Sequence, residues 1–209
     1  ESIVSNSTWK ASRGPITFSS IYGGEDYDAR LVQEGWNKAG FQDKAWIPAV
    51  IVDGPPVLET TITEPLKVMQ VFAPVKITQP RPRVYVYDLG QNFSGIPGIT
   101  VDGKSGEKIK IIPGEILDSN GLVNQQPSGG PAYFSYVLKG NGPESWQPQF
   151  TYYGFRYLQV EGGVPEREAN PNGLLVIRDI KGLHTRHSAQ TTGTFSCSNK
   201  LFNDIFKLI

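Results

Sequence analysis

The sequence predicts an all-β protein, an antiparallel β-sandwich that ends in a short C-terminal helix. Short runs of alternating apolar and polar residues recur along most of the 209-residue chain, and such period-2 runs are typical of half-buried strands. The chain is rich in turn residues, with 23 Gly and 16 Pro, which fits many short strands joined by tight turns. Strands do not alternate with helices, so a parallel α/β sheet is not expected.

The alternating runs place the individual strands. The clearest is Lys108–Ile112, which stops at Pro113, a residue that cannot donate to a strand ladder. Within Tyr152–Tyr157 the period of two places Tyr153, Phe155 and Tyr157 on one face, with Arg156 facing an acidic residue or another domain. We expect strands at residues 16–21, 27–31, 61–63, 67–72, 83–89 (ending at Gly90), 99–101, 108–112, 133–138, 155–161 and 174–177.

The last dozen residues change to a helical pattern. Ser198 is the expected N-cap, since its hydroxyl can accept a hydrogen bond from the first turn. The apolar residues after it have the spacing of a buried helix face; they are Leu201, Phe202, Ile205, Phe206 and Ile209. Because the chain stops inside this apolar pattern, we expect it to be a piece of a longer protein whose helical region begins here.

Composition excludes several classes of function. Lys and Arg total 20, as do Asp and Glu, and this balance argues against a nucleic-acid groove or an anionic membrane surface as a partner. No apolar run approaches the length of a membrane span, and residues 1–6 lack the pattern of a signal peptide. The single Cys197 is expected to be a small buried side chain.

Three stretches resemble one known family. The first comprises WKASRGPI at residues 9–16, IYGGEDYDAR at 21–30, and Gly35-Trp36. The second begins with YDLGQNFSG at 87–95, continues through Gly114-Glu115 and YVLKG at 136–140, and ends with WQPQFTYYGFRY at 146–157. With FSCSN at 195–199, these segments, in this order, are similar to family 78 glycoside hydrolases, the bacterial α-L-rhamnosidases.

The resemblance implies a division into three parts. Residues 1–55 would be the tail of an N-terminal β-sandwich module plus a linker, residues 56–190 a concanavalin-like (jelly-roll) β-sandwich, and residues 191–209 the start of a truncated (α/α)6 catalytic domain. It also implies a periplasmic or secreted parent enzyme that hydrolyses terminal α-L-rhamnosides with inversion. An inverting enzyme needs two separated carboxyl groups, which the family carries in the barrel. The chain itself is therefore expected to contain no catalytic residue, and its expected partners are the catalytic domain in cis and, through the parent, rhamnose-containing carbohydrate.

One acidic cluster is a candidate sugar site. Glu25, Asp26 and Asp28 lie close together in the sequence, and carboxylates can bind sugar hydroxyls or a calcium ion. Trp36 could stack on the sugar. The structural alternative is a turn in which these carboxylates pair with Arg30 or cap backbone amides. No cofactor is expected apart from this possible calcium ion.

Other polar motifs favour structural roles. Asn120-Gly121 predicts a turn rather than a calcium loop, because the spacing of a calcium-binding loop is missing. His184 and His187 lie in an extended segment without further ligands, so no metal site is predicted. The loop 124–131 is long and polar; it could border a domain interface or a substrate mouth, or be a plain surface loop.

Two rival functions stay open at this point. The chain could be a stand-alone carbohydrate-binding module that recognises rhamnose-type sugars, as the Glu25–Asp28 cluster and exposed aromatic residues would allow. It could also be a purely structural adhesion sandwich. Only the first of these two predicts binding of L-rhamnose, and only an enzyme piece predicts a catalytic domain after residue 209.

Overall fold

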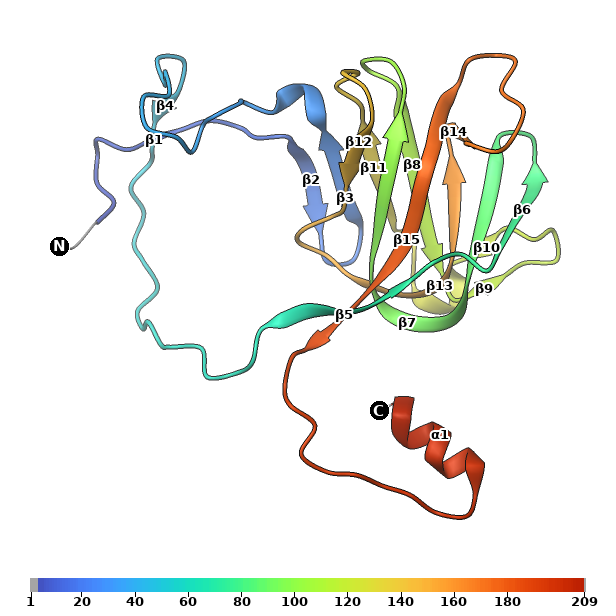
Figure 1. Cartoon of the computed structure of the whole chain (residues 1–209). Helices are drawn as coiled ribbons and strands as arrows, with labels where there is room; N and C mark the ends of the chain where they lie inside the picture. Colours follow the sequence, from blue (N-terminus) through green and yellow to red (C-terminus); the bar gives the residue numbers. More distant parts are fainter. Residues whose placement is uncertain (1–3, 209) are drawn as a thin grey trace.

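The computed structural model describes residues 4–208, and it is built mainly of strands (Figure 1). The elements are β1 (Lys10–Ala11), β2 (Ile16–Ser20), β3 (Gly24–Asp28), η1 (Ala29–Leu31), β4 (Ile47–Pro48), β5 (Leu66–Phe72), β6 (Lys76–Arg81), β7 (Val84–Asp102), β8 (Lys108–Gly114), β9 (Ile116–Leu117), β10 (Val123–Asn124), η2 (Gln126–Ser128), β11 (Tyr133–Val137), β12 (Glu144–Trp146), β13 (Tyr153–Glu161), β14 (Gly163–Pro165), β15 (Leu175–His187) and α1 (Lys200–Leu208).

The strands form a β-sandwich, as predicted. Eleven strands are linked into one curved sheet in the order β14-β15-β7-β13-β8-β11-β3-β2, with β12 and β6 on β7 and β5 on β15. The long strands β7 and β15 bend, so that the sheet folds over and encloses a core (Figure 1). Most neighbours are antiparallel, but β3 pairs with β11 and β14 with β15 in parallel, so the sheet is mixed rather than purely antiparallel.

The core follows the alternation seen in the sequence. Ile109 and Ile111 of β8 are fully buried, whereas Lys108 between the turn and Ile109 is exposed. This is the pattern of a strand with one face on the core. The largest fully buried side chains are Phe134, Phe155, Leu89, Ile109, Ile111, Leu138, Leu158 and Leu175.

A large bulge interrupts the pairing of β7 with β13. Phe155 lies opposite Phe93, and Tyr157 lies opposite Asp88, so residues 89–92 of β7 face the single residue Arg156. The Arg156 guanidinium closes the bulge with two hydrogen bonds of 2.8 Å to the Asp88 carboxylate. Arg156 thus has an acidic partner, which is one of the two alternatives expected from the sequence.

The bulge also corrects two predictions. β7 does not end at Gly90 but continues to Asp102, because Gly90 adopts φ 88° and carries the chain through the bulge. In β13, Phe155 is buried in the core, but after the bulge the core positions are Leu158 and Val160. Tyr157 therefore does not share the face of Tyr153 and Phe155, because the alternation along β13 changes phase across the bulge.

The N-terminal segment contributes to the same sheet. β3 pairs with β11 over five residues, and β2 pairs with β3. Gly24 makes the parallel pairing possible: its φ is 98°, and a Cβ there would lie 1.9 Å from the Tyr133 carbonyl oxygen. The domain boundaries predicted from the sequence stay a prediction, but hydrogen bonds connect residues 16–28 to the strands of residues 56–190.

Most other strands lie where they were predicted, and three local expectations were wrong. Residues 61–63 form no strand, and residues 29–31 are a short 3-10 helix instead of the end of a strand. The helix α1 confirms the C-terminal prediction, but its first turn is capped by Asn199, whose side-chain oxygen accepts from the Leu201 N–H at 3.0 Å, and not by Ser198. Ile209, the last residue of the predicted apolar stripe, lies outside the described residues.

Candidate functional site

The predicted acidic cluster lies on β3 and is divided by the strand. Successive side chains of a strand point to opposite faces, so Glu25 and Asp26 do not converge. Asp28, at the end of β3, caps the 3-10 helix that follows. The three carboxylates therefore have different roles, and the sequence pattern alone does not distinguish these roles.

Glu25 is completely buried. Its two carboxylate oxygens accept hydrogen bonds from the backbone N–H of Gln149, at 3.1 and 3.3 Å, and of Phe150, at 3.2 Å. These bonds satisfy a buried anion that would otherwise be costly. They also hold the loop before β13 against β3. The buried Glu25 therefore fixes the position of this loop.

Asp26 and Asp28 also have protein partners. The Ser135 hydroxyl of β11 donates to Asp26. Asp28 receives Arg30 in a two-pronged ion pair at 2.9 and 2.7 Å and accepts the Arg30 backbone N–H at 3.0 Å. The Arg30 guanidinium holds the pKa of the Asp28 carboxyl below its usual value. Asp28 thus pairs with Arg30 and caps a backbone amide, as the structural alternative in the sequence analysis expected.

Trp36 lies apart from these carboxylates, in a groove beside β3. The groove has a volume of about 460 Å³, and Trp36 and Trp46 line it. The Trp36 side chain is 61% exposed. The Trp46 indole donates to Gln33 at 2.7 Å, and Gln33 in turn donates to Ser12 at 2.9 Å. Trp46 is thus held in a fixed orientation. The sequence pattern gives no sign of this contact, because Trp46 and Gln33 are 13 residues apart.

Polar groups complete the groove. Gln149, positioned by Glu25, lines it together with Arg13 and Tyr27. Burial, the Glu25 charge and then the Glu34 charge raise the pKa of Tyr27. Its hydroxyl is protonated at neutral pH, as in an ordinary tyrosine, and can donate a hydrogen bond. Flat indoles beside a few fixed donors form the kind of surface on which a sugar ring can stack and hydrogen-bond.

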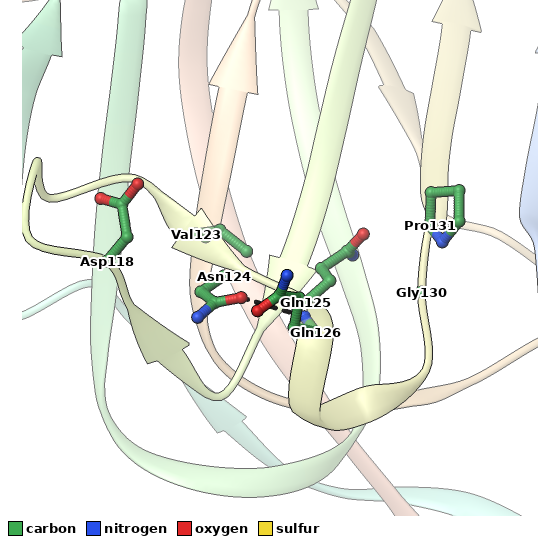
Figure 2. Close-up of a pocket in the computed structure, with 7 residues that line it drawn as sticks. All are labelled: Asp118, Val123, Asn124, Gln125, Gln126, Gly130 and Pro131. Atoms are coloured by element: carbon green, nitrogen blue, oxygen red, sulfur yellow. Dashed lines mark hydrogen bonds between the residues drawn. The ribbon is translucent and has the colours of Figure 1, made fainter.

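The long polar loop predicted at 124–131 is held in place from within. Gln125 donates from its amide to the carbonyls of Pro113 and Ala132, at 2.7 and 2.8 Å, and accepts from the Ala132 N–H at 3.0 Å. A shallow pocket lies between this loop and Asp118 (Figure 2). Figure 2 also shows the Asn124 side chain accepting from the Gln126 N–H, at 3.0 Å.

The remaining polar motifs contact the backbone. Gly121 adopts φ 78° in the turn between β9 and β10, and Asp118 accepts from the N–H groups of Asn120 and Leu122. His184 and His187 lie in β15, and each places Nδ1 against a backbone carbonyl. Among residues 4–208, no three potential metal ligands cluster, and α1 is too short to cross a bilayer.

Comparison with known proteins identifies the family. Residues 78–182 match the family described as the bacterial alpha-L-rhamnosidase concanavalin-like domain, and residues 1–70 match the alpha-L-rhamnosidase N-terminal domain. The chain belongs to the bacterial α-L-rhamnosidase family. The resemblance noted in the sequence is thereby confirmed, and so is its concanavalin-like fold.

Individual relatives agree with this assignment. An alpha-L-rhamnosidase of Formosa agariphila is 33% identical over 98% of the chain. The structure of alpha-L-rhamnosidase from Dictyoglumus thermophilum superposes with a TM-score of 0.86 at 36% identity over 97% of the chain. The Streptomyces avermitilis enzyme, solved in complex with L-rhamnose, gives 0.84 at 30% identity over 98%. The chain spans about a fifth of the length of these relatives, 21%, 22% and 19% respectively.

Proposed function

We propose that this chain is the non-catalytic β-sandwich part of an α-L-rhamnosidase and that it carries and positions the catalytic domain of the parent enzyme. The observation that carries the proposal is the match to the concanavalin-like domain together with a coverage of about a fifth of each relative. The parent hydrolyses terminal α-L-rhamnosides with inversion, as an exported enzyme in the periplasm or outside the cell.

The carboxylates of the chain support a structural role. Asp28, Asp88 and Asp102 each lie in an ion pair with an arginine, and Glu25 is buried under backbone amides. An inverting glycosidase needs one free carboxylic acid and one carboxylate about 6.5–9.5 Å apart across a substrate cleft. Carboxylates engaged in this way are poorly suited to that chemistry.

The C-terminal helix is the proposed link to the catalytic domain in cis. Its apolar residues are exposed to a substantial degree: Leu201 by 62%, Phe202 by 54%, and Ile205 and Phe206 by 43% and 42%. Such a stripe is stable only when another element covers it. Helices that continue the chain would provide that cover.

A hydrolysis assay tests the proposal. The 209-residue chain should release no phenol from an aryl α-L-rhamnoside, whereas the parent enzyme should release it and yield the sugar of inverted configuration. Turnover by the chain alone would refute the non-catalytic role, and an inactive parent would refute the activity. Hydrogen exchange in α1 should be slower in the parent than in the isolated chain if the helix packs on the catalytic domain.

The second candidate function is sugar binding in the groove beside β3, and the observation that favours it is the fixed indole of Trp46 beside the exposed Trp36. Here Trp36 would contact a rhamnose-type sugar. Glu25 would act by placing Gln149, and Asp26 and Asp28 by holding β3 and η1.

Titration of the chain with L-rhamnose, with and without calcium, tests this candidate by NMR of the indole N–H signals. Trp36→Ala should abolish any response, with Trp9→Ala, another exposed tryptophan, as the matched control. An unchanged spectrum at saturating sugar would eliminate the site.

A further inference from the structure

The bulge of β7 forms one wall of a further pocket, which is polar. The pocket has a volume of about 290 Å³ and lies where β5, β7, β15 and α1 meet. Its lining residues come from four elements: Met69, Gln70, Gln91, Asn92, Phe93, Ser94, His184, Arg186 and Lys207. The segment Gln91–Ser94 belongs to the motif that marked the family, yet neither the sandwich core nor the groove beside β3 accounts for its polar side chains.

The charge of this pocket is one-sided. Arg186 and Lys207 line it, and no lining residue is acidic. Lys67 lies directly opposite Arg186 in the ladder between β5 and β15. Like charges placed opposite each other in a sheet destabilise it. Within residues 4–208, none of these three cations takes part in an ion pair.

Some neutral side chains of the pocket are held by contacts within the fold. His184 places Nδ1 2.8 Å from the Ser94 carbonyl and meets the Phe93 ring edge-on at 6.0 Å. The Asn92 amide donates to the Glu115 carboxylate at 2.7 Å. Glu115 itself does not line the pocket. The site therefore combines an imidazole and an amide held in place, His184 and Asn92, with cations that lack a counter-charge.

We propose that this pocket binds an anionic saccharide through its carboxylate or sulfate group. Arg186 supplies a planar fork that matches an oxyanion, Lys207 and Lys67 supply further positive charge, and Gln70, Gln91 and Asn92 supply the amides that recognise hydroxyl groups. The choice of a sugar as the carrier of the anion rests on the proposed function, whereas the preference for an anion rests on the three cations alone. The ligand would sit beside α1, next to the proposed contact with the catalytic domain.

A matched set of sugars tests the proposal on the 209-residue chain. D-glucuronate, D-glucose 6-sulfate, D-glucose and inorganic sulfate are titrated at low salt, with binding followed by calorimetry and by the amide signals of Gln91 and Asn92. At least one charged sugar should bind saturably and more tightly than D-glucose, and added salt should weaken it, since exposed charges are screened. The comparison of the two charged sugars distinguishes carboxylate from sulfate.

Two variants locate the binding. Arg186→Gln and Lys207→Gln should each weaken binding of the charged sugar by about tenfold, the effect of losing one charged hydrogen bond. Lys44→Gln, at an exposed lysine of the N-terminal segment, should leave it unchanged. Near-ultraviolet circular dichroism checks that each variant is folded.

The outcomes that overturn the proposal are distinct. Equal affinity for D-glucose, or no saturable binding by either charged sugar, removes the anion site. Equal affinity for inorganic sulfate would show that the pocket recognises the anion without its sugar. An unchanged affinity in both variants would show that the charged sugar binds at another site. None of these results bears on hydrolysis by the parent enzyme, which the aryl rhamnoside assay tests separately.

Discussion

Replacing the buried Glu25 by glutamine separates a structural role of this carboxylate from a role in sugar binding. In the native chain the two oxygens accept from the backbone amides of Gln149 and Phe150 at 3.1–3.3 Å. Glutamine keeps one acceptor oxygen but turns an NH₂ group toward backbone donors. One Glu25 oxygen accepts from both amides, so the glutamine oxygen can keep both bonds, but these bonds lose their charge. The buried NH₂ group of glutamine then faces the Gln149 N–H, which is a donor, and finds no acceptor there.

The size of the effect follows from these contacts. Leaving a buried donor unpaired costs about 1–3 kcal/mol, while relief of a buried charge that has no cationic partner offsets part of this cost. We expect Glu25→Gln to lower the free energy of unfolding by about 1–2 kcal/mol. For a chain of this size that lowers Tm by roughly 2–8 °C.

Thermal unfolding followed by circular dichroism measures this change, and hydrogen exchange reports the Gln149 and Phe150 amides directly. Both amides should exchange faster in the variant. The control is Glu59→Gln, at an exposed residue outside any strand, which should stay within about 0.5 kcal/mol of the native chain. A variant as stable as the native chain, with both amides still protected, would refute the reasoning.

Three further predictions concern the sheet and its loops. Gly24→Ala should destabilise the chain by at least about 1–3 kcal/mol, because it adds backbone strain and a clash. The loss should exceed that of Gly142→Ala, a position with a similar φ of 100° but open space around it. Equal losses of stability in denaturant titrations would contradict the role of the clash. The Arg156 hydrogen bonds hold the pKa of Asp88 below its usual value, so the pair stabilises the fold above the usual pKa of an aspartate, and its contribution disappears as pH falls through the lowered pKa. Asp88→Asn should flatten this part of the stability–pH curve, and an unchanged curve would argue against it. Gln125→Ala removes the three hydrogen bonds that anchor the 124–131 loop to Pro113 and Ala132, and it should speed proteolytic cleavage in the loop while the Tm falls only slightly. An unchanged cleavage rate would show that the loop does not depend on this side chain.

Local patterns predicted the strands well where a strand is regular. The alternation in Lys108–Ile112 corresponds to β8, and the stripe from Leu201 to Phe206 corresponds to α1. The prediction was wrong at Gly90 and Tyr157 because a bulge is decided by both strands of a pair. The sequence of either strand alone carries no sign that residues 89–92 lie opposite one residue.

The candidate site was predictable in composition but not in arrangement. Glu25, Asp26 and Asp28 were correctly located on one short segment, but their separate partners come from Gln149, Ser135 and Arg30. Two of these three partners are more than 100 residues away in the sequence. Residue types therefore indicated polar chemistry without indicating what it contacts.

The sequence by itself determined the β class, the turn at Asn120-Gly121, the C-terminal helix and the family, because these depend on local periodicity or on short ordered motifs. Only the tertiary structure decided that β3 pairs in parallel with β11 and that Arg186 and Lys207 share one pocket. A period-2 pattern says which face of a strand is buried but not which strand lies beside it. That choice depends on contacts between distant segments, which exist only once the chain has folded.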